Sequence, residues 1–139
     1  MQKELRLLIR LARQEMDERR IEMVQAASAR AEADAALVSH AEQFEREIQA
    51  PANDPVGLLT FGAWRRHALD VRTGLRAQRD VCAGEEAAAL ESVREAFTDL
   101  KRLEVAQDQV LRDARLHAIR QADRMADGAQ VLMPLDVAA

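Results

Sequence analysis

Very few residues of this chain have the types and spacing that catalysis requires. The five glycines are isolated from one another, and neither Lys3 nor Lys101 follows one at the spacing of a phosphate-binding loop. No glycine-flanked turn of the kind that exposes a nucleophilic serine surrounds Ser28, Ser39 or Ser92. The sequence therefore predicts a protein that is not an enzyme and that uses no cofactor.

The single cysteine adds no reactive site. Cys82 has no second cysteine with which to form an internal disulfide, which favours a reducing compartment. It also falls on the apolar stripe described below, where a buried thiol is usually inert. We therefore expect Cys82 to be buried and to act as a small hydrophobic side chain.

The composition is typical of long helices that pack along a thin seam. Hydrophobic residues make up 48% of the 139-residue chain, yet aromatic residues make up only 3%. Much of the hydrophobic share is alanine, which favours helix but buries little area. Charged residues, at 32%, complete the pattern. The net charge of −4 argues against nucleic acid as the main partner.

The N-terminal segment predicts neither a secretion signal nor a membrane span. Charged side chains at Lys3, Glu4, Arg6 and Arg10 interrupt any apolar core of a signal peptide. No stretch approaches the roughly 20 apolar residues that cross a bilayer. We therefore expect a soluble, cytoplasmic protein with a single domain over residues 1–139.

Residues 2–49 contain neither proline nor glycine, and they predict one long helix. Larger apolar residues recur in it at intervals of seven, the heptad spacing of a coiled-coil seam. Arg19 and Arg30 interrupt this seam, either to fix the register or to bind a partner. The seam positions are Leu5, Ile9, Ala12, Met16, Arg19, Met23, Ala26, Arg30, Ala33, Leu37, His40 and Phe44.

A turn is predicted at about residues 50–60. Pro51 and Pro55 lie in it, and proline in a helix interior removes a donor and clashes with the preceding turn. Asparagine, aspartate and glycine complete a turn composition. The two helices on either side are therefore expected to fold back against each other.

The second helix has two possible starts. Asp54 is the cap in one, with Pro55 at the first helical position, and Thr60 is the cap in the other. We favour Thr60, because Gly57 weakens the earlier start. Helix two is therefore predicted to span residues 61–127.

Helix two carries a similar stripe, with an expected change of phase past Gly84. Such a shift changes the local supercoil without ending the helix. Asp127 and Gly128 predict the end of the helix, because glycine can form a left-handed cap, and the tail 128–139 is expected to be irregular. The stripe is Phe61, Trp64, Ala68, Val71, Leu75, Gln78 and Cys82, then Leu90, Val93, Phe97, Leu100, Leu111, Ala114 and Ala118.

The position of the turn predicts a register. Partners in an antiparallel hairpin centred there have residue numbers that sum to about 107, which places Phe44 near Trp64. His40 and His67 also approach one another, but four convergent metal ligands cannot be named, so we expect no metal site. Residues beyond about 107 have no partner within the chain. The predicted fold is an all-α, antiparallel two-helix coiled-coil hairpin with a longer second helix.

These features resemble the FliJ family, the soluble, stalk-like component of the flagellar type III protein export apparatus, and the related YscO-type proteins of injectisomes. The resemblance covers nearly the whole chain. It rests on the length, the shorter first helix, the loop, the longer second helix and the segment Phe61-Gly62-Ala63-Trp64-Arg65-Arg66 at the start of helix two. It implies a non-catalytic role in flagellum biogenesis and protein transport, and so in motility and chemotaxis.

The resemblance also implies three partners at the cytoplasmic face of the export apparatus: the export ATPase hexamer, the cytoplasmic domain of the export gate protein, and export chaperones. Contact with the membrane would come through these partners only. The positions that would bind the ATPase ring are Leu5, Leu8, Arg10, Arg13, Val110, Leu111, Arg112, Arg115, Arg120 and Arg124. The positions that would bind the gate are Leu37, His40, Phe44, Trp64, Ala68, Val71 and Leu75.

Alternative interpretations stay open at this point. A generic coiled-coil scaffold would dimerise by pairing the overhang of helix two with a second copy. The equivalent stalk protein of a virulence type III secretion system would share most of these features. The gate-binding residues lie on the seam and alternatively form only core, and the arginines of the overhang alternatively form only a solvated face.

Overall fold

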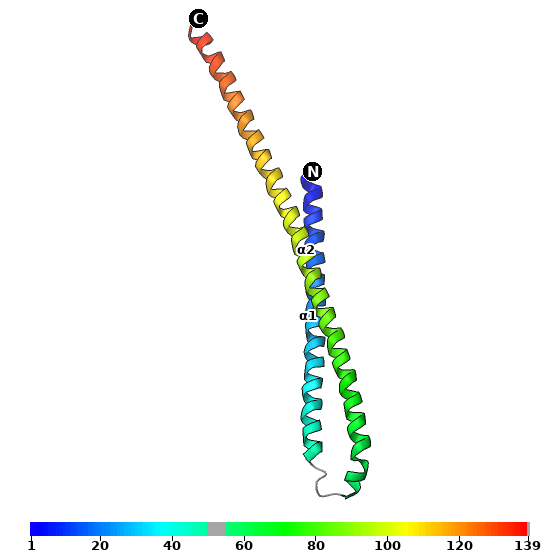
Figure 1. The fold of residues 1–139 in the computed structure, drawn as a ribbon. Helices are drawn as coiled ribbons and strands as arrows, with labels where there is room; N and C mark the ends of the chain where they lie inside the picture. The colour runs from blue at the N-terminus through cyan, green and yellow to red at the C-terminus, as the bar shows by residue number, and fades with distance from the viewer. Residues whose placement is uncertain (50–54, 139) are drawn as a thin grey trace. The chain divides into compact units, whose positions relative to one another are not determined.

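The structure, a computed structural model, describes the backbone of residues 1–49 and 55–138 and the side chains of residues 1–49 and 56–129. These residues form two helices and no strand: α1 is Gln2–Gln49 and α2 is Pro55–Ala138 (Figure 1). The prediction of an all-α chain is confirmed, and α1 has the predicted bounds.

The start of α2 differs from the favoured prediction. The helix begins at Pro55 and not at Phe61, as the alternative had it. Proline suits the first helical position because its φ is already helical and its missing N–H is not needed there. Gly57 costs a helix about 1 kcal/mol relative to alanine, which is too little to stop it. Thr60 therefore lies inside the helix, where its hydroxyl donates to the carbonyl oxygens of Val56 and Gly57 at 3.4 and 3.2 Å.

The end of α2 also differs from the prediction. The backbone is helical through Ala138, whereas a stop was predicted at Gly128 and an irregular tail after it. No described glycine has a positive φ, so Gly128 forms no left-handed cap. Glycine permits that conformation without requiring it, and the neighbouring Ala126 and Ala129 favour helix. The predicted turn residues 50–54 lie outside the described residues.

The contacts of the chain divide it into two compact units. Unit 1 joins Met1–Gln14 to Phe97–Ala139, and unit 2 consists of Glu15–Ala96. The single domain that the sequence predicts remains a prediction.

Small side chains make up most of the buried seam of unit 2. Ala33, Ala68, Cys82 and Ala96 are less than a tenth exposed, as is the larger Met16. The distance between packed helices depends on the side chains at the contact, so small ones allow a close approach. Cys82 is buried, as predicted. Unit 2 therefore has a thin seam and no thick core.

The heptad predicted for α1 matches its burial. Each of the twelve seam positions between Leu5 and Phe44 is buried or half-buried. Glu47 continues the repeat and is half-buried too. Off the seam, Ile21 and Val24 are 59% and 62% exposed although both are apolar. Spacing therefore decides burial along α1 more than the hydrophobicity of each residue does.

The predicted change of phase past Gly84 is wrong. Val93 and Leu100, which it placed on the seam, are covered, but Leu90 and Phe97 are 40% and 46% exposed. Ala89 and Ala96 lie on the covered side in their place. The prediction assumed that the larger apolar residues mark the seam, whereas closely packed helices favour small side chains at the contact. The covered positions continue at intervals of seven through Gly84: Phe61, Ala68, Leu75, Cys82, Ala89, Ala96, Leu103 and Val110.

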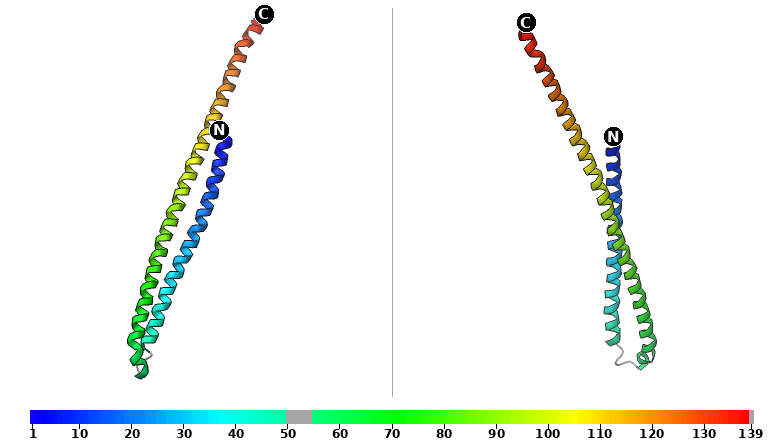
Figure 2. Two further views of the ribbon diagram at one scale, coloured as in Figure 1. Left: turned by 90° about the vertical axis from the view of Figure 1, so that its right-hand side faces the viewer. Right: turned by 45° about the horizontal axis from the view of Figure 1, so that its top comes forward.

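In unit 1, α1 covers only part of α2. Ile9 and Leu100 are 4% and 8% exposed and form the buried centre. Every residue of 111–129, which we call the C-terminal extension, is exposed. Figure 2 shows the N-terminal end of α1 beside the yellow part of α2, with the orange-to-red part continuing past it. The overhang that was expected beyond residue 107 therefore begins at Leu111.

Candidate interaction surfaces

Arg19 joins the two helices of unit 2. Its Nη1 donates to the carbonyl oxygen of Ser92 at 3.0 Å and lies 3.8 Å from the carboxylate of Glu95. Its Nε donates to Glu15 Oε1 at 2.8 Å within α1. The stem of the side chain can lie on the seam while the guanidinium is paired at its edge. These contacts favour a role of Arg19 in fixing the register of the two helices, and its role in binding a partner stays a prediction.

Arg30 has a similar arrangement. Its guanidinium lies 3.7 Å from Asp34 in α1 and 3.7 Å from Glu86 in α2. All three side chains are partly exposed, so each ion pair contributes at most about 1 kcal/mol. Both seam arginines thus exchange apolar packing for directional contacts, which a one-residue slip of the helices would break.

The contacts between the helices of unit 2 follow a consistent order. Arg19 contacts Glu95, whereas Phe44 contacts Trp64. As the residue number rises along α1, the number of the partner in α2 therefore falls. The numbers of Phe44 and Trp64 sum to 108, close to the predicted 107.

Longer side chains contact partners further along α2. The numbers of Arg19 and Ser92 sum to 111, and those of Arg19 and Glu95 sum to 114. Side chains in a helix lean toward its N-terminus, so a long one contacts a partner beyond its own level. In the contact of Arg19 with the backbone oxygen of Ser92, only one long side chain leans, so the sum of the residue numbers rises a little. In the contact of Arg19 with Glu95, two long side chains lean, so the sum rises further. These contacts therefore fit a single register within unit 2.

Four aromatic rings stack near the start of α2 and form what we call the ring cluster: His40, Phe44, Trp64 and Phe61. The ring centroids lie 6.3 Å apart for His40 and Phe44, 5.4 Å for Phe44 and Trp64, and 5.5 Å for Trp64 and Phe61. Stacked aromatic pairs contribute about 0.5–1.5 kcal/mol beyond their burial. Because two rings come from each helix, the ring cluster holds the helices together at this end of unit 2.

A hollow of about 280 Å³ borders the ring cluster. His40 and His67 both line it, so the structure brings the two histidines together as the predicted register requires. His40 Nδ1 is buried without a hydrogen-bond partner among the described residues. Within the same residues, no group of three histidine, cysteine, aspartate or glutamate side chains is placed to hold a metal ion.

The residues that were predicted to bind the gate lie in unit 2 and are mostly covered. Ala68 is 8% exposed and offers a partner little surface, whereas Val71 is 38% exposed. The others are half-buried: Leu37, His40, Phe44, Trp64 and Leu75. These side chains pack the two helices and leave only their edges to a partner. Their role in gate binding stays a prediction.

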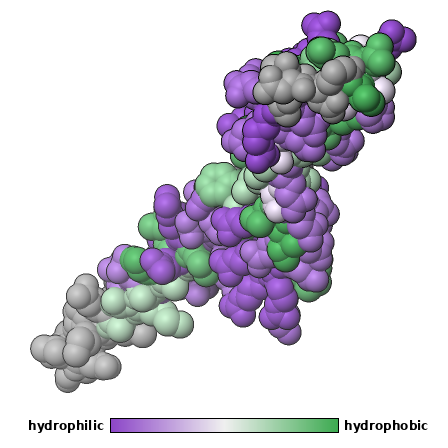
Figure 3. Space-filling view, turned by 90° about the horizontal axis from the view of Figure 1, so that it is seen from below, coloured by the Kyte–Doolittle hydropathy of each residue, from purple (hydrophilic) through white to green (hydrophobic). Residues whose placement is uncertain are grey.

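Three exposed aliphatic side chains at the start of α2 were not singled out from the sequence. Val56, Leu58 and Leu59 are 69%, 60% and 86% exposed. The sequence predicts a turn over these residues, whereas the earlier start of α2 puts them on a helix. Hydrophobic (green) side chains are interspersed with hydrophilic (purple) ones over the face of the molecule shown in Figure 3.

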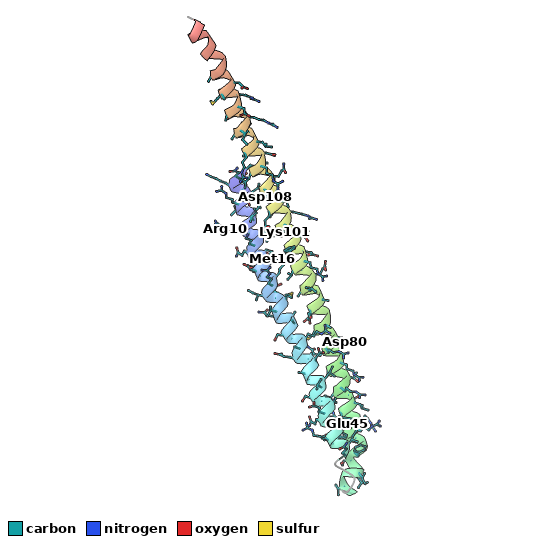
Figure 4. All side chains as sticks on the ribbon, turned by 90° about the vertical axis from the view of Figure 1, so that its left-hand side faces the viewer. Arg10, Met16, Glu45, Asp80, Lys101 and Asp108 are labelled. Carbon is teal, nitrogen blue, oxygen red and sulfur yellow. The ribbon has the colours of Figure 1, made fainter. Side chains whose placement is uncertain are left out.

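Unit 1 contains all of the residues that were predicted to bind the ATPase, some in α1 and the others in α2. Across its helices, Arg13 of α1 lies 3.8 Å from Glu104 of α2. Lys101, which is also in α2, lies 3.2 Å from the same carboxylate. Figure 4 shows Arg10 on α1 beside the part of α2 that carries Lys101 and Asp108. This stretch therefore places cationic side chains of α1 against a mixed surface of α2.

A second hollow, which we call the arginine notch, lies within unit 1. It measures about 280 Å³ and is lined by Arg6, Ile9, Arg10, Arg13 and Gln107. Arg6 was not among the predicted binding residues. Its signal in the sequence was the spacing of three and four residues that puts it on one helix face with Arg10 and Arg13.

The C-terminal extension is exposed and mixes arginines with apolar side chains. Leu111, Leu116, Ile119 and Met125 are 37%, 49%, 56% and 79% exposed. Of the predicted ATPase-binding residues, Leu5 and Val110 are half-buried. The others are exposed: Leu8, Arg10, Arg13, Leu111, Arg112, Arg115, Arg120 and Arg124. Their role toward an ATPase also stays a prediction.

Neither helix, over its described residues, has a stretch long and apolar enough to cross a membrane. Comparison of the chain with known protein families, characterised proteins and solved structures finds no match.

Proposed function

We propose that the chain is an antiparallel two-helix coiled-coil hairpin that acts as a non-catalytic, cytoplasmic stalk in the protein export apparatus of the bacterial flagellum. The heptad burial of both helices and the order of the contacts in unit 2 support the coiled coil. The resemblance of the sequence to the FliJ family supports the place in the export apparatus.

The observation that carries the proposal is the change along α2 at Leu111. Up to Val110 the helix has covered positions at regular intervals, and beyond it every described residue is exposed. A helix that continues without a partner in its own chain presents all of its faces to another molecule. Four arginines, at 112, 115, 120 and 124, lie on this stretch. Their planar guanidinium groups suit carboxylates on a protein surface.

In the proposed mechanism, the two ends of the hairpin bind different partners. The C-terminal extension and the first turns of α1 enter the ring of the export ATPase. The edge of the ring cluster meets the cytoplasmic domain of the export gate protein, and free export chaperones bind along the stalk. A seam of small side chains, locked by Arg19 and Arg30, resists sliding of the helices and so transmits position or rotation from the ring to the gate.

Co-purification with the export ATPase tests this proposal. Glutamine in place of Arg112, Arg115, Arg120 and Arg124 should lower the recovered ATPase about tenfold or more, because charged anchors of a buried contact dominate binding. The matched control replaces Arg65, Arg66, Arg76 and Arg20, which are exposed in unit 2 and give the same change of charge. Full-length protein that recovers no ATPase, or a control that loses as much, would contradict the proposal.

A dimerising scaffold is the second candidate, and the exposed apolar residues of the C-terminal extension favour it. Leu111, Leu116, Ile119 and Met125 would be covered if two copies paired there. Analytical ultracentrifugation separates the candidates. The stalk predicts a monomer of 15.5 kDa, whereas the scaffold predicts a dimer that Leu116→Asp with Ile119→Asp dissociates.

A further inference from the structure

We propose that the arginine notch of unit 1 is a binding site for a phosphate group. This inference goes beyond the proposed function and does not rest on it, because the ligand is a small oxyanion and no export partner is needed to test it.

The arginine notch is lined by several side chains that carry hydrogen-bond donors. Arg6, Arg10 and Arg13 are spaced by four and three residues, so α1 carries them on one face. Gln107 of α2 adds a half-buried side-chain amide, and Ile9, 4% exposed, closes the floor. The hollow of about 280 Å³ exceeds the volume of roughly 30 Å³ that one water molecule occupies, so a polyatomic anion fits.

The arginines of the notch are available to such a ligand. Among the described side chains, no carboxylate lies within ion-pair distance of Arg6 or Arg10. Arg13 pairs with Glu104 at 3.8 Å, but its side chain is 64% exposed, so this pair is weak. Glu104 has a closer partner in Lys101 at 3.2 Å.

The charge of this part of unit 1 favours an anion although the whole chain is acidic. Residues 1–14 contain four basic side chains and one acidic side chain, Glu4, which the N-terminal amine contacts at 3.0 Å. On the opposing stretch of α2, Glu104 and Asp108 are the carboxylates next to Gln107. Their charge weakens the attraction of an anion without cancelling it, since the four basic side chains of residues 1–14 outnumber Glu4, Glu104 and Asp108.

A phosphate group suits this arrangement better than a single carboxylate. Each guanidinium offers a planar fork of donors, and two acceptor oxygens satisfy one fork. Three such forks and an amide that line one hollow therefore suit an ion with three or more charged oxygens. Such a phosphate has two possible sources: a free ion such as a nucleoside diphosphate, or the headgroup of an anionic lipid.

Exposed leucines next to the arginine notch give a reason to test an anionic lipid as the source of the phosphate. Leu7, Leu8 and Leu11 are 56%, 47% and 51% exposed on the same turns of α1. A helix segment that carries arginines beside exposed leucines can lie at a lipid surface. The free-ion source needs the arginines alone.

The test uses the full-length protein and inorganic pyrophosphate as the probe. Titration followed by the NMR signals of arginine Nε–Hε groups should show saturable shifts for Arg6, Arg10 and Arg13. The pair Arg6→Gln with Arg10→Gln should raise the half-saturating concentration at least about fivefold, because charge-assisted hydrogen bonds are lost. The matched control, Arg65→Gln with Arg66→Gln, changes the net charge equally at exposed positions of unit 2 and should leave binding unchanged.

Flotation with vesicles then identifies the source. Binding to phosphatidate-containing vesicles that Leu7→Ser with Leu11→Ser abolishes, while pyrophosphate binding stays, would assign the lipid headgroup. Pyrophosphate binding without vesicle binding would assign a free phosphate. The proposal is overturned by the absence of saturable shifts, by equal losses in the control pair, or by equally tight binding of citrate, which would make the notch a carboxylate site.

Discussion

Two consecutive stretches of α2 in unit 1 have similar residues and opposite surroundings. Residues 97–110 alternate between covered and exposed positions, and Leu100 is 8% exposed, whereas no residue of the C-terminal extension is covered. Both stretches are helical, both are rich in charged residues, and each contains two leucines. Composition therefore predicts helix in both, and the presence of α1 decides which side chains become core.

The two stretches also differ in what stabilises the helix. In residues 97–110, burial of apolar side chains against α1 contributes. The C-terminal extension gains from helix propensity and from continuing a helix that is already nucleated, which spares it the cost of the first turn. A local hydrogen bond from Gln109 to Asp113 at 3.1 Å spans the boundary. The extension should therefore fray at lower denaturant concentration than the covered stretch.

The largest expected effect comes from placing a charge in the covered stretch. Leu100→Asp should lower the free energy of unfolding by about 3 kcal/mol or more, because it removes apolar burial and desolvates a carboxylate. Leu116→Asp, at a side chain 49% exposed, is the matched control and should cost less than about 1 kcal/mol. Urea unfolding followed by circular dichroism measures both. Equal costs would mean that the C-terminal extension is covered as well.

A smaller effect is expected from enlarging a side chain at the seam. Ala96 is 4% exposed, so Ala96→Leu should destabilise unit 2 by about 1–3 kcal/mol through overpacking. Ala118→Leu in the C-terminal extension should change stability by no more than about 0.5 kcal/mol. If Ala96→Leu leaves the urea midpoint unchanged, the seam is looser than its small residues indicate.

The seam arginine provides the next comparison. Arg19→Gln should cost about 1 kcal/mol, since the carbonyl of Ser92 and the carboxylate of Glu95 lose a cationic partner. The neighbouring Arg20 is 57% exposed and pairs with Asp17 at 3.9 Å, so Arg20→Gln should be neutral within error. Added salt should weaken the difference between the two variants. Equal urea midpoints for the two variants would mean that Arg19 does not fix the register.

The smallest expected effect is a gain in stability at Gly84. A Cβ built there meets no atom within 4 Å, so Gly84→Ala should add about 0.5–1 kcal/mol by restricting the unfolded chain and favouring helix. Gly128→Ala, which also meets open space, should raise the helical signal but leave the midpoint unchanged, since the extension lies outside the covered seam. A loss of stability in Gly84→Ala would indicate a contact at this position that the structure does not contain.

Covered positions could be predicted from the sequence where they recur at a strict interval. Every position that the heptad of α1 predicted to be on the seam is covered, including the unexpected Arg19 and Arg30. The prediction of the α2 seam failed where residue size was used in place of the interval, as at Leu90 and Phe97, which are large and exposed. The prediction of both ends of α2 also failed, because Pro55 and Gly128 tolerate helix as readily as they end it.

The candidate surfaces divide in the same way. The approach of His40 to His67 followed from the position of the turn alone. Val56, Leu58 and Leu59 were missed, because their exposed place on a helix depends on a helix start that local residue preferences left undecided. The spacing of Arg6 from Arg10 and Arg13 is visible in the sequence, but the hollow that it shares with Gln107 depends on the second helix.

By itself, the sequence determined that this chain is helical, that α1 runs without a break to Gln49, and that one face of it is a seam. These properties follow from local preferences and from the repeat of seven, which each helix carries within itself. Tertiary structure alone decided that Ala89 and Ala96 are covered while Leu90 and Phe97 are exposed, that the overhang begins at Leu111, and that three arginines and a glutamine share one hollow. Such facts depend on where a second helix lies, and no single helix encodes that in its own residues.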